Sequence, residues 1–191
     1  MNGRAALSVD RATGLLQGVR QVLCPHRDDR PAGCEPSLIV VHGISLPPGE
    51  FGGPWIDRLF CGDLPPAEHP YFAEIAGRRV SAHVLIRRDG TPVQYVPFQA
   101  RAWHAGASRL EGRDACNDFS VGIELEGTDE LPYEEAQYET LAAVIEALRE
   151  SQDSLRDAPV VGHSDIAPGR KTDPGPAFDW QRLYALLRAI A

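Results

Sequence analysis

The sequence predicts a single α/β domain with a mixed central sheet, flanking helices and long loops. Short β-branched runs alternate with two segments whose apolar residues recur at helical spacing, and no segment is repeated. The 191 residues, 43% of them hydrophobic, suffice for one core without disulfides or a structural metal. We expect the domain over residues 35–191, with residues 1–34 as an N-terminal extension packed on or near it.

The first expected strand covers residues 37–43, where an apolar, β-branched run leads to His42. Such uninterrupted runs are typical of a central strand that is buried on both faces. Residues 46–77 are rich in proline, glycine and aromatic residues, and only 55–60 resembles a short helix. A segment of this length and composition is more often a binding loop or lid than a linker.

Two further strand patterns follow. Residues 80–86 and 93–96 alternate in polarity around an Arg-Asp-Gly turn at 88–90, which predicts a hairpin. Residues 120–126 also alternate, so that their apolar side chains share one face. The opposite face carries Gly122, Glu124 and Glu126.

The last third of the chain predicts two amphipathic helices. The first opens at Pro132, and the second follows Asp179 as its N-cap. Between them, residues 158–161 form a short strand that leads to His163. The apolar stripes are Tyr138, Leu141, Val144, Ile145 and Leu148 in the first helix and Trp180, Leu183, Leu186, Leu187 and Ile190 in the second.

Charge and composition exclude several classes of function. A net charge of −8 without a basic run disfavours binding to nucleic acid or to an anionic membrane surface. The longest apolar run, residues 38–41, is far shorter than the roughly 20 residues of a membrane span. Residues 1–22 lack a signal-peptide core, and the 4 cysteines share no CxxC spacing. We therefore expect a cytoplasmic monomer with free thiols.

Two histidines mark the expected functional edge of the sheet. His42 and His163 lie at or just past the ends of expected buried strands, where open α/β sheets expose functional groups. Asp173 follows in a loop framed by proline and glycine, which can return its carboxylate to His163. Two imidazoles and a carboxylate form a hydrolytic zinc site when a fourth position is left for water. For each residue alone, the alternative is a purely structural hydrogen bond.

Hydrolysis of an amide at such a site also needs a base and a stabiliser of the oxyanion. Glu124, on the polar face of its strand, is the candidate base, and Lys171, two residues before Asp173, is the candidate cation. Taken alone, each is more often a solvated surface charge. The functional interpretation therefore requires that these groups converge.

Five segments, taken in order, carry a resemblance to a known family. They are residues 42–57, 79–90, 101–106, 116–128 and 162–176. In them the chain resembles the zinc N-acetylmuramoyl-L-alanine amidases, and most of all the cytosolic members that recycle 1,6-anhydro-muropeptides. The resemblance implies a single-domain zinc amidase fold, shared with peptidoglycan recognition proteins and phage amidase lysozymes.

The resemblance also implies roles for individual residues. By motif position, Zn²⁺ would be bound by His42, His163 and Asp173, with Glu124 as proton acceptor and Lys171 as stabiliser of the oxyanion. These roles agree with the interpretation of each residue from its own surroundings in the sequence.

Substrate contacts are expected from two more residues in these motifs. Arg79 would bind a substrate carboxylate through its guanidinium, and Trp103 would pack against sugar or peptide. The alternatives are a surface ion pair and a core aromatic residue. His83 and His104 are expected to be structural.

Two positions depart from the family pattern. Gly43 stands where an asparagine is common, so that a side-chain contact to substrate is lost. Ala115 stands where a basic residue can occur, which would leave recognition of the stem peptide to Arg79 or Arg113. We expect both changes to affect substrate affinity rather than the chemistry.

The expected activity is zinc-dependent hydrolysis of the lactyl amide between (1,6-anhydro)-N-acetylmuramic acid and L-alanine in muropeptides, in peptidoglycan recycling. Relatives with this activity are linked to β-lactamase induction. One alternative is an exported cell-wall amidase, which the lack of a signal-peptide pattern disfavours. Another is a non-catalytic peptidoglycan-recognition module, which the complete set of ligand and base residues disfavours.

Overall fold

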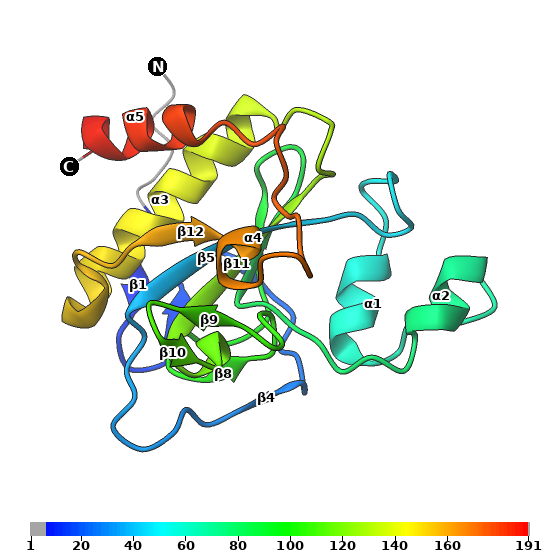
Figure 1. Ribbon diagram of the computed structural model, residues 1–191, viewed down its shortest axis with the longest axis horizontal. Helices are drawn as coiled ribbons and strands as arrows, with labels where there is room; N and C mark the ends of the chain where they lie inside the picture. The colour runs from blue at the N-terminus through cyan, green and yellow to red at the C-terminus, as the bar shows by residue number, and fades with distance from the viewer. Residues whose placement is uncertain (1–6, 191) are drawn as a thin grey trace.

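The computed structural model describes residues 7–190, apart from the side chain of Ile190. Its centre is a six-stranded sheet with the order β12-β5-β11-β6-β7-β3 (Figure 1). The first four strands are parallel, β7 is antiparallel to β6, and β3 is parallel to β7, so the predicted mixed sheet is confirmed. In chain order the strands are β3 (Arg20–Gln21), β5 (Leu38–Ile44), β6 (Val84–Ile86), β7 (Pro92–Gln94), β11 (Ser120–Glu126) and β12 (Val160–Gly162).

Helices cover both faces of this sheet (Figure 1). On one face, α3 and α5 pack against each other and against the apolar side chains of β5, β6 and β11. The other face is covered by α1, α2, α4 and the loop from 100 to 119. No helix within residues 7–190 is long and apolar enough to cross a membrane. The helices are α1 (Trp55–Cys61), α2 (Pro70–Ile75), α3 (Glu135–Ser151), α4 (His163–Ile166) and α5 (Trp180–Ile190).

The strand register brings the candidate functional residues to one level. Glu124 of β11 pairs with His42 of β5 in the parallel ladder. On the other side of β5, Gly162 of β12 pairs with Val41, so His163 follows at the level of His42. These three residues therefore lie side by side at the C-terminal ends of adjacent strands.

The helix boundaries differ in part from the prediction. The prediction that a helix opens at Pro132 is wrong, since α3 begins at Glu135. The backbone of Glu134 is extended, and its N–H donates to the side chain of Gln137, which caps the helix at this point. At α5 the predicted cap is confirmed, because Asp179 Oδ1 accepts the N–H of Arg182 at 2.9 Å.

Several short elements were not predicted from the sequence. They include α2, the single turn of α4 and, within residues 7–190, seven strands of two residues each. The observed β6 is also shorter than the alternating segment that predicted it. Elements this short contain less than two periods of any pattern, so periodicity does not reveal them. Besides β3, the two-residue strands are β1 (Val9–Asp10), β2 (Leu15–Leu16), β4 (Arg27–Asp28), β8 (Arg101–Ala102), β9 (Arg109–Leu110) and β10 (Arg113–Asp114).

The segment before β5 is fastened to the domain by Arg30. Its guanidinium donates to the backbone carbonyls of Asn117, Asp118, Ser120 and Phe98 at 2.9–3.3 Å. Hydrogen bonds from a charged donor are stronger than neutral ones. Arg30 therefore holds the N-terminal segment against the start of β11.

We expect Arg30→Met to lower the free energy of unfolding by about 2–3 kcal/mol, because four carbonyls lose their charged donor. Arg156→Met serves as control, since the Arg156–Asp153 pair is exposed and such pairs contribute about 0–1 kcal/mol. Urea unfolding measures both variants. Equal losses in the two variants would contradict the fastening role of Arg30.

Candidate active site

The three predicted metal ligands converge at the C-terminal edge of the sheet. His42 Nδ1 lies 3.0 Å from His163 Nδ1 and 3.2 Å from Asp173 Oδ2, and His163 Nδ1 lies 3.1 Å from the same oxygen. Donor atoms that bind zinc tetrahedrally at about 2.0–2.1 Å are roughly 3.3 Å apart. The three side chains therefore fit a zinc ion, and each offers one ligand atom.

Each ligand comes from a different part of the local structure. His42 lies near the end of β5, and His163 is the first residue of α4. Asp173 lies in the loop after α4, and its backbone carbonyl accepts the N–H of Ser164 at 3.0 Å. This hydrogen bond folds the loop back onto α4 and carries the carboxylate to the histidines, as the Pro/Gly-framed sequence predicts.

The surroundings favour the protonation states that bind a metal. Burial lowers the pKa of His42 to about 4, so its imidazole is neutral at pH 7. Burial alone would raise the pKa of Asp173, but its contacts with His163 and His42 outweigh this effect and hold the pKa well below its usual value. Metal ligands must be neutral imidazoles and ionised carboxylates, and His42 and Asp173 meet that requirement.

A cavity of about 580 Å³ contains the three ligands in its wall. Another part of the wall comes from the predicted binding loop, through residues such as Pro48, Phe60 and Tyr71. Glu124 and Lys171 also line this cavity. The predicted base and the predicted cation therefore face the same space as the metal ligands.

Glu124 lies in this wall without a hydrogen-bond partner for its Oε2 atom in the described chain. Burial raises the pKa of Glu124 well above its usual value, and the negative charge of Asp173 adds to the rise, whereas Lys171 opposes it. A carboxylate that no protein donor satisfies is free to accept a proton from water. Lys171 itself is exposed, with its charge near both Glu124 and His42.

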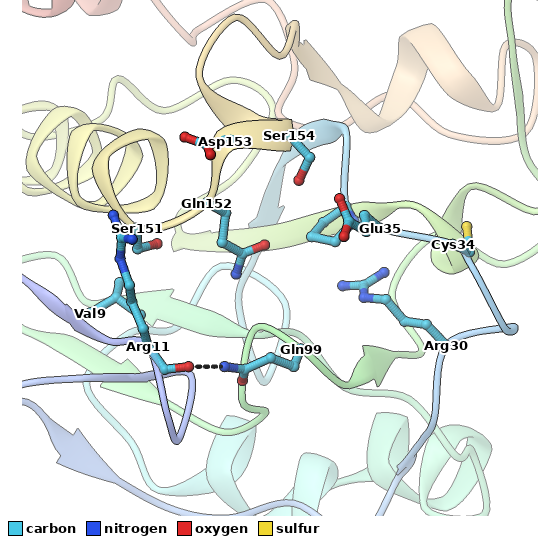
Figure 2. A pocket seen from close by; sticks show the side chains of 11 residues that line it. Val9, Arg11, Arg30, Cys34, Glu35, Gln99, Ser151, Gln152, Asp153 and Ser154 are labelled. Carbon is cyan, nitrogen blue, oxygen red and sulfur yellow. Dashed lines mark hydrogen bonds between the residues drawn. The ribbon is translucent and has the colours of Figure 1, made fainter.

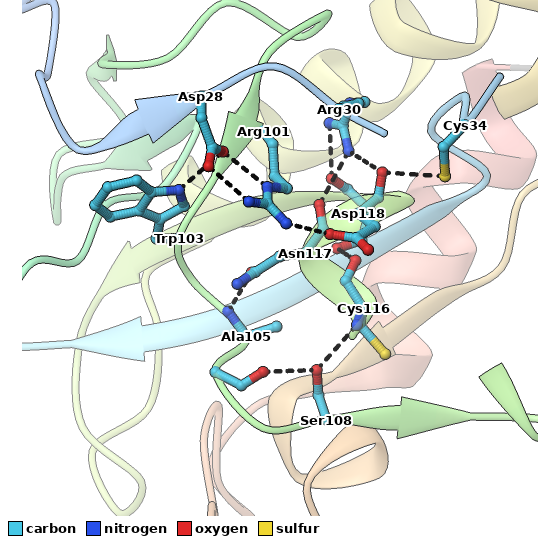
Figure 3. A network of polar contacts seen from close by, with 12 residues as sticks. Asp28, Arg30, Cys34, Arg101, Trp103, Ala105, Ser108, Cys116, Asn117 and Asp118 are labelled. Atoms are coloured by element: carbon cyan, nitrogen blue, oxygen red, sulfur yellow. Dashed lines mark hydrogen bonds and ion pairs between the residues drawn. The ribbon is translucent and has the colours of Figure 1, made fainter. Parts of the chain in front are cut away.

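The structure separates the two predicted substrate contacts. Trp103 lines the cavity, and its indole N–H donates to Asp28 at 3.0 Å, within a network that also pairs Asp28 with Arg101 (Figure 3). Arg79 is not part of the cavity wall, since its guanidinium covers the Trp103 ring at 5.0 Å from the ring centroid. Arg78, which the sequence did not single out, lines the cavity instead.

His104, which the sequence predicts to be structural, contacts the predicted metal ligand His42. Its Nδ1 atom lies 2.9 Å from Nε2 of His42. His83 is buried behind it, where its Nδ1 atom accepts the N–H of Gly122 at 3.0 Å. The sequence placed His104 inside a motif, but no spacing rule shows which side chain a histidine in a loop will meet.

Gly43 has no space for a side chain. A Cβ atom at this position would lie 2.3 Å from the hydroxyl oxygen of Tyr133. This hydroxyl donates to the backbone carbonyl of Pro174 at 3.0 Å, next to the ligand Asp173. The space that a side chain at position 43 would need is therefore occupied by the anchor of the Asp173 loop.

Glu126 fastens the binding loop rather than facing solvent. Its carboxylate is buried and accepts hydrogen bonds from the backbone N–H groups of Gly52 and Arg88 at 2.7 and 3.2 Å. It also forms an ion pair with Arg87 at 3.2 Å. Glu126 thus ties the loop to the end of β6, close to the cavity.

Another cavity, of about 430 Å³, lies between the N-terminal segment and the C-terminal end of α3 (Figure 2). Its wall includes Arg11, Gln99 and residues 151–154, and Gln99 donates to the backbone carbonyl of Arg11. None of the predicted site residues lines it. The candidate chemistry therefore belongs to the cavity at the edge of the sheet.

A family model described as N-acetylmuramoyl-L-alanine amidase matches residues 32–176, which include every predicted ligand and the predicted base. The chain belongs to this amidase family. The resemblance that five sequence segments indicate is thus confirmed, and the protein is an N-acetylmuramoyl-L-alanine amidase.

This amidase is similar to proteins characterised as 1,6-anhydro-N-acetylmuramyl-L-alanine amidases. It is 63% identical to AmpD of Escherichia coli (strain K12) over 174 residues, which cover 91% of this chain and 94% of AmpD. The crystal structure of a selenomethionine AmpD derivative matches it with a TM-score of 0.90 at 61% identity, covering 94% of this chain and 98% of that one. The crystal structure of AMPDH3 from Pseudomonas aeruginosa in complex with an anhydromuramic pentapeptide matches with a TM-score of 0.58 at 28% identity. The match covers 79% of this chain and 59% of that one.

We expect Gly43→Ala to destabilise the amidase by about 1–3 kcal/mol because of overpacking against Tyr133. Tyr133→Phe alone should cost about 1 kcal/mol for the lost hydrogen bond. The double variant should cost less than the sum, since the next atom of Tyr133 would lie 3.6 Å from the new Cβ, an ordinary contact. Urea unfolding in the presence of a chelator measures the free energy of unfolding of the wild type, the two single variants and the double variant. Strictly additive losses would contradict a clash between the new Cβ and the Tyr133 hydroxyl.

We also expect Glu124→Gln to stabilise the zinc-free amidase at pH 7–8 by about 1 kcal/mol or more, because an unpartnered buried carboxylate is removed. Since the folded-state pKa of Glu124 is raised above its unfolded value, stability is lost as the pH rises from the unfolded pKa through the folded one. The gain should therefore shrink as the pH falls and vanish below about 4.5, where both states are protonated. Glu139→Gln, at an exposed position of α3, should show no such pH dependence in urea unfolding.

Proposed function

We propose that this amidase binds zinc through His42, His163 and Asp173 and hydrolyses the lactyl amide between 1,6-anhydro-N-acetylmuramic acid and L-alanine in muropeptides. The observation that carries this proposal is the convergence of three ligand atoms within 3.0–3.2 Å of one another, beside an unpartnered carboxylate in the same cavity. The 63% identity to a 1,6-anhydro-N-acetylmuramyl-L-alanine amidase supports the anhydro form of the substrate.

A zinc ion held by these ligands supplies a Lewis acid for the scissile carbonyl and lowers the pKa of a water molecule to about 7. Glu124 takes a proton from the attacking water and returns it to the leaving amine of L-alanine. The ammonium of Lys171, which lines the same cavity, stabilises the oxygen that becomes negative in the transition state. The position of Glu124 beside His42 in the β5–β11 ladder keeps the base next to the ligands.

Substrate binding is proposed to use the wall of the cavity around Trp103. The indole offers a flat apolar surface, and the network through Asp28 holds it in place. Arg79, whose guanidinium lies over the Trp103 ring but outside the wall itself, is proposed to bind a carboxylate of the stem peptide. The cavity of about 580 Å³ is large enough for part of a muropeptide.

The proposed setting is recycling of soluble muropeptides in the cytosol. Mass-spectrometric assay of an anhydro-muramyl tripeptide and of intact sacculi, each with zinc-loaded and zinc-stripped protein, tests it. Zinc-dependent release of peptide from the soluble substrate alone is the expected result. Cleavage of sacculi instead would favour an envelope amidase, and binding without cleavage would favour a recognition module.

We expect Glu124→Gln to retain zinc affinity but to lose about 10²–10⁴-fold in kcat, the usual contribution of a general base. The matched control Glu139→Gln should keep both zinc affinity and turnover, because that side chain is exposed on α3. Zinc affinity is measured by competition with a chelator and turnover by peptide release. Near wild-type turnover of Glu124→Gln would remove Glu124 from the role of base.

A further inference from the structure

Both histidine ligands direct their second ring nitrogen at the same dipeptide. His42 Nε2 lies 2.9 Å from His104 Nδ1, and His163 Nε2 lies 3.2 Å from the backbone carbonyl oxygen of Ala105. Neither member of the His104–Ala105 dipeptide is a metal ligand. The dipeptide therefore contacts the predicted metal site through the second ring nitrogens of the two histidines.

The dipeptide is itself held in place from the start of β11. Asn117 Oδ1 accepts the backbone N–H groups of both His104 and Ala105, at 3.1 and 2.8 Å. Figure 3 shows the contact between Asn117 and Ala105. The imidazole of His104 lies against Gly122, where a Cβ atom would come within 2.4 Å of the ring. The glycine that shares the polar face with Glu124 thus provides the space for this ring.

The hydrogen bonds set the direction in which protons are donated. Ser120 donates its only hydroxyl proton to the carbonyl of Cys116, at 2.6 Å, so its oxygen offers a lone pair to His104 Nε2, 3.1 Å away. His104 then carries its proton on Nε2 and presents Nδ1 as an acceptor to His42. With its proton on Nε2, His42 donates to His104 and leaves the lone pair of Nδ1 for a metal. With its proton on Nδ1, His42 would donate to Asp173 instead, so the hydrogen bond to His104 competes with the one to Asp173.

The second ligand is set in a simpler way. A carbonyl oxygen only accepts, so the 3.2 Å contact with Ala105 is a hydrogen bond when His163 carries its proton on Nε2. Arg170 Nη2 lies 3.4 Å from the same nitrogen, a longer contact than its 2.6 Å to the Ala105 carbonyl. The Nδ1 lone pair of His163 then faces the same point as that of His42. Arg170 also donates to the Ala105 carbonyl, at 2.6 Å, and fixes its position.

We infer that the His104–Ala105 dipeptide, with Ser120 behind it, selects the Nδ1-ligand tautomer of both histidines before the metal arrives. His104 and Ser120 are thus positioning residues for the metal site. The inference rests on the zinc site of the proposed function, and it concerns zinc affinity rather than the hydrolytic steps. In the other tautomer the ligand histidine would point a proton at the metal, so that binding would first require the proton to move.

The first test is the tautomer of His42 in full-length, zinc-free protein. Long-range ¹H–¹⁵N spectra of histidine-labelled protein distinguish a protonated ring nitrogen from an unprotonated one, and the His42→Gln variant assigns the signals. We expect the proton on Nε2 and none on Nδ1. A proton on Nδ1 of His42, or an even mixture of tautomers, would overturn the inference.

The second test is the affinity for zinc alone, measured by chelator competition. His104→Leu removes the acceptor and should weaken zinc binding about 10–100-fold, the usual effect of losing an outer partner of a ligand histidine. His104→Asn should restore most of the affinity, since its side-chain oxygen can occupy the place of Nδ1. Ser120→Ala should give a smaller loss than His104→Leu, whereas Ser151→Ala, which loses a comparable hydroxyl bond to a carbonyl in α3, should give none.

The outcomes separate the inference from the proposed function. If His104→Leu and His104→Asn bind zinc as tightly as the wild type while the wild type cleaves anhydro-muropeptides, the inference fails and the function stands. If His104→Leu loses zinc affinity but the wild type cleaves no muropeptide, the inference stands and the function fails. If His104→Leu does not fold, the zinc affinity of His104→Asn and the tautomer of His42 in the wild type still test the inference.

Discussion

The parallel register of β12, β5 and β11 is the constraint on which the site depends. Pairing of Glu124 with His42, and of Gly162 with Val41, fixes three functional residues at one level of the sheet. A slip of one residue in the β5–β11 ladder would turn Glu124 to the face under α3 and α5. The apolar side chains of β11 on that face therefore stabilise the register, so the core beneath the sheet determines the position of the base above it.

Around this fixed edge, the site is completed by loops that the sheet does not position directly. The Asp173 loop is held by the Ser164 N–H and by the hydroxyl of Tyr133, and the binding loop is held by the buried Glu126. These are polar anchors rather than apolar ones. Each anchor satisfies backbone groups that would otherwise be unpaired.

Much of this arrangement could be predicted from the sequence, for identifiable reasons. The strands at 37–43 and 120–126 have strong patterns because both are central and buried, and His42, Glu124 and His163 follow from where those strands end. The partners of His104, Glu126 and Gly43 could not be predicted, because each lies in or against a loop whose path depends on tertiary contacts. Arg79 shows the same limit. The sequence identified its motif, but could not predict that its guanidinium would cover Trp103 while Arg78 lines the cavity.

The guanidinium of Arg30 has a consequence for how small this enzyme can be made. The family model begins at residue 32, yet Arg30 donates to the carbonyl of Ser120, the residue whose side chain contacts His104. A fragment trimmed to the family boundary would keep every ligand and the base but lose the donor that holds the start of β11. The contacts that stabilise the start of β11 thus extend upstream of the segment by which the family is recognised.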